Sequence, residues 1–237
     1  EPPTQGLGNT GFIIAQTGNQ TINAQSIDLT GGGGSENTAT ISAWANGVTQ
    51  SVTATGSITL TGGSAQFTRA EIASYGNQSV VAEAGDISLT QSGLGEARIG
   101  NGFTYQTFLL PDPLANTFVL SAGASGTGSL ILNGGSIWAD DALQLYAGSA
   151  GQLNSGYIKV GQASGAAPAG TIVVDAGKTL DLSGSLTGGA LTNNGTFTLI
   201  GASYLADSGI VNNGTLELQS TTAGAGSVGT STGTLAN

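Results

Sequence analysis

The sequence contains no cysteine, histidine or methionine among its 237 residues, and only four lysines and arginines. Without cysteine or histidine, the usual zinc sites, iron–sulfur clusters and serine–histidine triads are excluded in practice, so we expect no cofactor. Four basic residues against 14 acidic ones form no basic patch for nucleic acid or for an anionic membrane surface. No apolar run approaches the ~18 residues of a membrane-spanning helix, so we expect no membrane insertion.

Charged and aromatic residues are also scarce, at 8% and 5% of the chain. An ordinary globular domain has about 25% charged residues, and such a low charge could indicate disorder. However, 38% of the residues are hydrophobic and they recur at regular intervals, which indicates a packed core. With 41 glycines but only 5 prolines, the chain is not collagen-like.

One unit is written three times between residues 20 and 102, with a spacing of 27 to 31 residues. Each copy places apolar residues at the same positions. The equivalent sets are Ile22, Val52 and Val80; Ile27, Ile58 and Ile87; Leu29, Leu60 and Leu89; and Ile41, Ile72 and Ile99. A fixed period in this range predicts a stacked repeat architecture.

Within each unit, apolar residues alternate with small polar ones, which is the pattern of short half-buried strands. Three such strands, each followed by a turn, would make one coil of a parallel β-helix, whose inner face is buried only when coils stack. An antiparallel sandwich with regular hairpins also has many short strands. We favour the all-β parallel β-helix, or solenoid, because like-on-like stacking explains why the same residue types recur at the same places.

We expect a lead-in or cap over residues 1–19, one β-helix domain over 20–220, and a flexible tail or linker over 221–237, where Gly, Ser, Thr and Ala dominate. The repeat returns more loosely after residue 120. The six strand candidates there are 129–133, 137, 142–146, 157–160, 171–174 and 179–182.

Residues 103–120 interrupt the repeat with four aromatic residues and with Pro111 and Pro113. Because proline cannot lie in a central strand, we expect a hairpin-like excursion with its tip at these prolines. The excursion either projects as a binding or docking element or packs on the shaft as a flap. The candidate ligand or partner contacts are Tyr105, Phe108 and Trp138.

A second repeat is sharper: residues 191–199 match residues 210–218 at an offset of 19. Its turn-forming residues are Asn194, Gly195, Asn213 and Gly214, because Asn-Gly supplies the positive φ of a tight turn. An isolated Asn-Gly is also typical of a two-residue hairpin. Since the pair recurs, we predict a corner between strands of successive coils.

The repeats resemble two families of large bacterial surface proteins. Residues 56–63 (Gly-Ser-Ile-Thr-Leu-Thr-Gly-Gly) and 84–90 (Ala-Gly-Asp-Ile-Ser-Leu-Thr) resemble the shaft repeats of filamentous-haemagglutinin-like exoproteins, and the Asn-Asn-Gly-Thr segments at 193–196 and 212–215 resemble autotransporter passenger repeats. Both families are built on right-handed parallel β-helices and serve adhesion and biofilm formation. The resemblance covers most of 20–220, although the Asn-Pro-Asn motifs of the two-partner secretion domain do not occur. It therefore implies an internal or carboxy-terminal piece, or a free-standing relative.

Many β-helices are polysaccharide lyases or hydrolases, which need clustered carboxylates and a basic residue. The sequence offers only single bases, and its one acidic pair, Asp140 and Asp141, should point to opposite faces. Asp28 and Asp86 are expected at equivalent positions of coils one and three, roughly 10 Å apart, near the upper limit of about 9.5 Å for an inverting glycosidase. The four bases are Arg69, Arg98, Lys159 and Lys178.

We therefore expect a structural shaft segment of a bacterial extracellular adhesin or surface filament, and no enzyme. Its partners would be other copies or neighbouring segments of the same surface protein, stacked end to end. A carbohydrate-binding β-helix module for host or matrix glycans is the alternative. A polysaccharide lyase or hydrolase is the third reading, and it would need three carboxylates converging in one groove.

Overall fold

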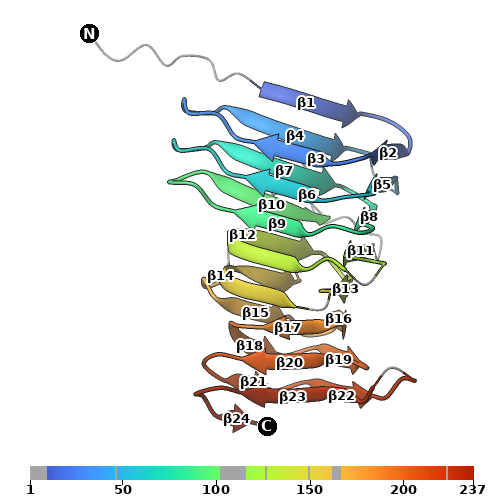
Figure 1. Ribbon diagram of the computed structural model, residues 1–237, viewed down its shortest axis with the longest axis vertical. Coiled ribbons are helices and arrows are strands. Elements are labelled where there is room, and N and C mark those ends of the chain that lie inside the picture. The colour runs from blue at the N-terminus through green and yellow to red at the C-terminus, as the bar shows by residue number, and fades with distance from the viewer. Residues whose placement is uncertain are drawn as a thin grey trace.

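The computed structural model describes residues 10–45, 47–101, 116–125, 127–148, 150–161, 167–222 and 224–237, and none of these residues is helical. Every pairing between named strands is parallel. The strands lie in stacked layers, with β1 at one end and β24 at the other (Figure 1). The chain therefore forms a parallel β-helix, as the repeat predicts.

Three faces run along the helix. The first face contains, in order, β1 (Thr10–Ala15), β4 (Thr38–Ala43), β7 (Arg69–Ser74), β10 (Glu96–Asn101), β12 (Leu130–Ala139), β14 (Gly151–Val160), β15 (Thr171–Val174), β18 (Ala190–Asn193), β21 (Ile210–Asn212) and β24 (Leu235–Ala236). The second face contains β2 (Gln20–Ala24), β5 (Thr49–Ala54), β8 (Asn77–Ala82), β11 (Thr117–Ala122), β13 (Ala142–Tyr146), β16 (Thr179–Ser183), β19 (Thr196–Ile200) and β22 (Thr215–Gln219).

The third face contains β3 (Ile27–Thr30), β6 (Ile58–Thr61), β9 (Ile87–Thr90), the first halves of β12 and β14, β17 (Ser185–Thr187), β20 (Ser203–Ala206) and β23 (Ser227–Thr230). Both β12 and β14 bend around the corner into the first face, and their mutual register shifts at Asn133. Gly134 and Gly156, with φ of 89° and 91°, allow these bends. Because β12 and β14 belong to both faces, the first and third faces form one 16-stranded sheet, separate from the 8-stranded second face.

Apolar residues of successive coils stack directly on one another inside the helix. The register of the first three coils matches all four sets that the sequence predicts. The longest column crosses all ten strands of the first face. It consists of Ile13, Ile41, Ile72, Ile99, Ile137, Ile158, Ile172, Leu191, Ile210 and Leu235. Its eight inner members are at most 2% exposed, so the core is continuous along the stack.

Three predicted boundaries need correction. Strand β1 lies within the expected lead-in and pairs with β4, so the helix already includes residues 10–15. Strand β11 begins at Thr117, so the end of the expected excursion belongs to the second face, while residues 102–115 lie outside the described part. The expected flexible tail contains β23 and β24, which pair with β20 and β21. Val228 and Leu235 continue the core columns there despite the polar composition.

Candidate functional site

Trp138 is the one predicted aromatic contact among the described residues. It points outward from the first face, yet it is only 6% exposed. Its ring packs against Tyr157 of the next strand, with centroids 5.7 Å apart at 48°, and shares a small apolar cluster with Ala73. A ring this buried does not offer its face to a sugar, so the structure gives no support to Trp138 as a sugar contact. Tyr105 and Phe108 lie outside the described residues.

The two Asn-Gly pairs occupy the predicted corners, between β18 and β19 and between β21 and β22, whose strands pair in parallel. However, none of Asn194, Gly195, Asn213 and Gly214 has a positive φ, so the reason given for them is wrong. The glycines are required by close stacking instead. A Cβ on Gly195 would lie 2.3 Å from the Lys178 carbonyl oxygen, and one on Gly214 would lie 2.1 Å from the Gly195 carbonyl oxygen.

Two ladders of buried amide side chains line the corner between the first and second faces. Gln78 donates to Gln50 at 2.6 Å, and Gln50 donates to Gln20 at 2.7 Å. In the last coils Asn193 donates to Asn212 at 2.7 Å, and Asn212 donates to Asn237. The recurrence of glutamine at the start of each unit was the signal in the sequence that could have revealed the first ladder.

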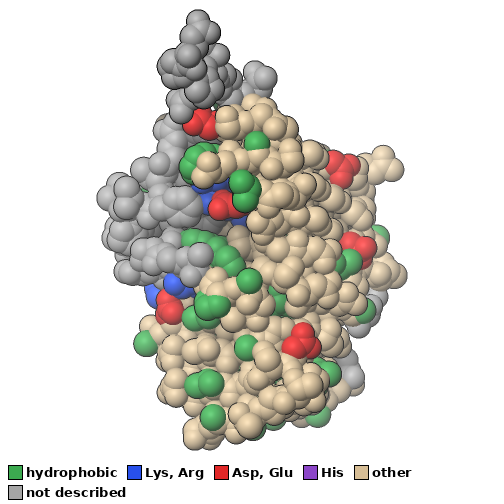
Figure 2. Space-filling view, turned by 90° about the vertical axis from the view of Figure 1, so that its left-hand side faces the viewer, with side chains coloured by type: hydrophobic (Ala, Val, Ile, Leu, Met, Phe, Trp, Pro, Cys, Tyr) green, Lys and Arg blue, Asp and Glu red, His purple; other side chains and the backbone are tan. Residues whose placement is uncertain are grey.

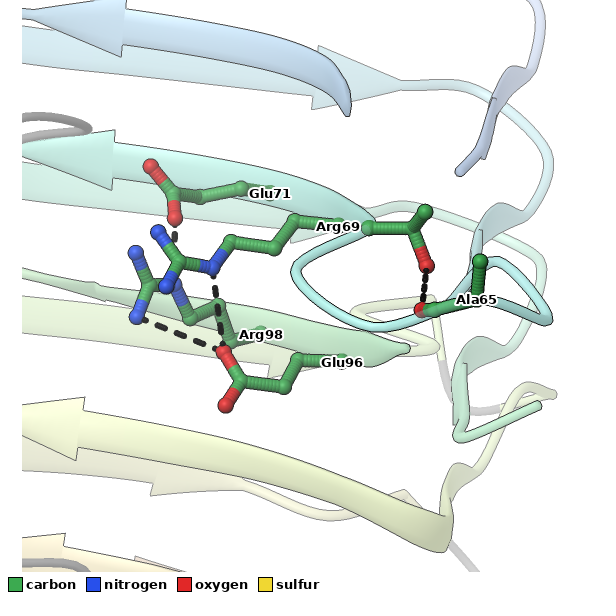
Figure 3. A network of polar contacts seen from close by, with 6 residues as sticks. Ala65, Arg69, Glu71, Glu96 and Arg98 are labelled. Atoms are coloured by element: carbon green, nitrogen blue, oxygen red, sulfur yellow. Dashed lines mark hydrogen bonds and ion pairs between the residues drawn. The ribbon is translucent and has the colours of Figure 1, made fainter. Parts of the chain in front are cut away.

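A cluster of four charged side chains lies on the outer side of the first face, where β7 and β10 run side by side (Figure 3). The register sets Arg69 beside Glu96 and Glu71 beside Arg98. The Arg98 guanidinium donates to the Glu71 carboxylate, and the Arg69 Nε lies 3.2 Å from Glu96. The sequence reading treated Arg69 and Arg98 as single bases and missed this cluster. The signal was the reversed order of charge, Arg-Ala-Glu in one unit and Glu-Ala-Arg in the next.

The two ion pairs of this cluster differ in burial. The side chains of Arg98 and Glu71 are 3% and 0% exposed, whereas Glu96 is 54% exposed. A buried pair gains little net stability, because desolvation offsets the attraction, but it is costly to break. The cluster also specifies the register. A two-residue slip, which keeps the apolar side inward, would set Glu71 beside Glu96 or Arg69 beside Arg98, and like charges would then meet.

Aromatic neighbours lie close to this cluster. Burial raises the pKa of the Tyr157 hydroxyl, while hydrogen bonds with Ser136 and Trp138 partly oppose that effect.

Figure 2 shows basic and acidic side chains side by side at two places on this side of the molecule, whereas most of the visible described surface is uncharged. The remaining bases also have acidic partners: Lys159 lies 3.7 Å from Asp175, and Lys178 pairs with Asp141.

The acidic pair considered for glycoside hydrolysis is not brought into register. Asp28 aligns with Thr59, and Thr59 aligns with Ser88 rather than with Asp86. Asp86 precedes β9, and its carboxylate accepts a hydrogen bond from the Ser129 N–H at 2.8 Å. The expected equivalence of Asp28 and Asp86 is therefore wrong by two positions. Among the described residues, no three acidic side chains gather as a metal ion would require.

A groove of about 360 Å³ lies on the outer side of the second face, across β11, β13, β16 and the end of β19. Leu120, Leu145 and Leu182 of these strands form part of the core column, so their neighbours in the strands point outward. The polar side chains that line the groove are Ser121, Gln144, Tyr146, Asp181 and Ser183. Asp181 is the only charged residue among the described lining residues.

The described strands and turns include no helix with the length and apolarity needed to cross a membrane. A scan against protein-family models finds no match for the chain, and searches of curated proteins and of solved structures find none either.

Proposed function

We propose that this chain is a structural shaft segment of a bacterial extracellular adhesin or surface filament. The observation that carries the proposal is the column of ten aliphatic residues on the first face, which runs from Ile13 to Leu235 without a polar interruption. Such a column makes the coils one continuous rod, because each coil depends on its neighbours to bury its inner face. A rod of this kind provides mechanical reach and presents whatever it carries away from its anchor.

Both ends of the rod expose residues of the core columns. Ile13 at one end is 56% exposed, while Leu218 and Leu235 at the other are 53% and 58% exposed. Among the described strands, β1 pairs with β4 alone and β22 with β19 alone, so each of these end strands has an edge that no described strand covers. Exposed edges and core residues of this kind favour pairing with another strand. End-to-end contact with another copy or with a neighbouring segment of the same surface protein would cover them.

The placement outside the cell rests on the resemblance of the repeats to the shafts of secreted bacterial exoproteins. The surface composition supports this reading, because serine, threonine and asparagine take the place of lysine and glutamate on the described strands. Carbohydrate binding at Trp138 is not proposed, because the ring is buried.

Negative-stain electron microscopy of the purified chain across a concentration series tests the proposal. We expect unit rods at low concentration and rods lengthened by whole units at high concentration. Ile13→Lys should abolish lengthening, because it places a charge in the terminal core column. Phe12→Lys is the matched control, since Phe12 is 61% exposed on the same strand but alternates with the core-column residue Ile13 and therefore lies on the outer side. Unit rods at every concentration, or equal lengthening of the Ile13→Lys variant, would contradict end-to-end contact.

A further inference from the structure

The groove on the second face follows a stretch of surface that, on its N-terminal side, is lined by short side chains. Two outward rows cross it along the helix axis. One row runs from Val119 through Gln144 to Asp181, and the other from Ser121 through Tyr146 to Ser183. In the coils on the N-terminal side the same rows carry small residues, namely Ser51, Thr53, Ser79 and Val81. The first long polar side chains of these two rows, Gln144, Tyr146 and Asp181, therefore lie where the surface is hollow.

Three side chains of the groove have the chemistry that recognises a sugar. Tyr146 offers an aromatic ring that is partly exposed, and Gln144 offers both an amide donor and a carbonyl acceptor. Asp181 is an acceptor with two oxygens, suited to neighbouring hydroxyl groups. Within the described ranges, no hydrogen bond engages any of these three side chains. They are therefore available to a ligand, unlike the charged cluster on the first face, whose members pair with each other.

We propose that this groove binds a neutral oligosaccharide chain that lies along the helix axis. Its volume of about 360 Å³ is within the range of about 300–1,000 Å³ typical of small-molecule sites. Successive strands are about 4.8 Å apart, so Gln144 and Asp181 reach successive positions along one extended chain, while the Tyr146 ring packs on the apolar face of a sugar ring. Asp181 would repel an acidic sugar, and none of the described lining residues is a base that could compensate.

This site is independent of the proposed shaft. The shaft depends on inward-facing columns and on the two ends, whereas the groove is built from outward-facing residues in the middle of the stack. A shaft without a working groove would still lengthen end to end, and a groove on a rod that does not self-associate would still bind its ligand. Failure of one proposal can therefore be told apart from failure of the other.

Isothermal titration calorimetry of the full chain tests the site. The probes are cellohexaose, maltohexaose, laminarihexaose, mannohexaose and chitohexaose, with hexagalacturonate as the acidic comparison. We expect at least one neutral hexasaccharide to bind and hexagalacturonate to bind more weakly than it does. Tyr146→Ala should weaken binding about tenfold, and Asp181→Asn by about three- to tenfold. Tyr146→Phe, which keeps the ring, should stay within about threefold of the original chain.

The control is Glu217→Gln, which lies in the same outward row as Asp181 but two strands further along, on β22 outside the groove. It should leave binding unchanged, and circular dichroism should show that all four variants are folded. No binding of any of the five neutral hexasaccharides at millimolar concentration would overturn the proposal. So would unchanged binding in the Tyr146→Ala variant, equal losses in Asp181→Asn and Glu217→Gln, or tighter binding of hexagalacturonate.

Discussion

The coils of residues 20–101 and those of residues 171–219 bury the same columns with very different lengths of chain. Gln20 and Gln50 are 30 residues apart and Glu71 and Arg98 are 27 apart, whereas Asn193 and Asn212 are only 19 apart. The extra residues lie in the corners. Residues 31–37 and 62–68 connect the third face to the first in the N-terminal coils, but Gly188 and Gly189 alone do so after β17.

The two kinds of corner use different backbone conformations. Gly188 and Gly189 have φ of 97° and 72°, which lets the chain reverse direction within two residues. The long N-terminal corners instead hold Glu36 and Phe67 at φ of 64° and 63°, a conformation that is costly for residues with a Cβ. The short corner thus depends on two glycines in the left-handed region, whereas the columns of core residues set the stacking in both kinds of coil.

The greatest loss of stability is predicted for the buried ion pair of the N-terminal coils. Arg98→Leu should lower the free energy of unfolding by about 3–5 kcal/mol, because it leaves the fully buried Glu71 carboxylate without its partner. Arg69→Leu is the matched control on the neighbouring strand, and it should cost at most about 1 kcal/mol, since Glu96 is half exposed. Urea unfolding followed by circular dichroism measures both. Equal losses would show that burial does not distinguish the two pairs.

A smaller loss of stability is predicted for the buried amide ladder of the C-terminal coils. Asn193→Ala should cost about 1–3 kcal/mol, because the buried Asn212 oxygen and the Thr215 carbonyl lose their donor. Asn194→Ala removes an exposed bond to Asn213 and should cost less than about 0.5 kcal/mol. The same urea experiment compares these adjacent residues. If Asn194→Ala were the costlier change, the buried ladder would not be what holds this corner.

A smaller change in stability depends on pH. Burial raises the pKa of the Tyr204 hydroxyl well above its ordinary value of 10.0, so the folded chain keeps a proton that the unfolded chain loses. Stability is therefore fully present below pH 10 and is lost as the pH rises above it. Tyr204→Phe should cost about 1 kcal/mol at neutral pH, through the lost bond to the Gly188 carbonyl, and should flatten the alkaline loss.

Thermal unfolding between pH 8 and about pH 11.5 follows this change. Tyr157→Phe is the comparison, because the pKa of the half-buried Tyr157 is also raised, and it should flatten the alkaline loss less. An alkaline loss in the Tyr204→Phe variant as steep as in the original chain would contradict the assignment.

The smallest changes in stability are predicted for substitutions in the corners between faces. Phe67→Gly should raise stability by up to about 1 kcal/mol, because glycine tolerates the left-handed backbone and the exposed ring contributes little. Phe67→Ala removes the ring but keeps the strain, so it should not be stabilising. Gly184→Ala in a C-terminal corner should have the opposite sign, since its φ is 82° and a Cβ would lie 2.5 Å from the Gly148 carbonyl oxygen. The melting temperatures of the three variants, compared with that of the original chain, test these expected changes in stability.

Much of the fold was predictable because the signal is local and repeated. The alternation of apolar and small polar residues predicts strands, and the recurrence of Ile58 after Ile27 and of Ile87 after Ile58 predicts their register. The register after residue 121 was not predictable, because β14 and β15 both lie on the first face only 14 residues apart, as Tyr157 and Thr171 show. The sequence has no repeat with this 14-residue offset, so no pattern in it predicts that β14 and β15 pair.

The candidate sites were less predictable, because they depend on burial and on neighbours in other coils. The aromatic content of the sequence favoured Trp138, but the structure buries that ring beside Tyr157. Gln144, Tyr146 and Asp181 carry no motif, and they come together only because β13 and β16 pair directly although Leu143 and Leu180 are 37 positions apart.

Composition and short periods were enough to predict the β-helix and its apolar columns, and the composition contains no cysteine or histidine. The folded chain was needed to show which outward residues become neighbours, which of them are buried, and where the surface is hollow. Stacking brings together residues from 14 positions apart, as for Tyr157 and Thr171, to 43 apart, as for Ile87 and Leu130, because the corners between them vary in length and local patterns do not encode that length.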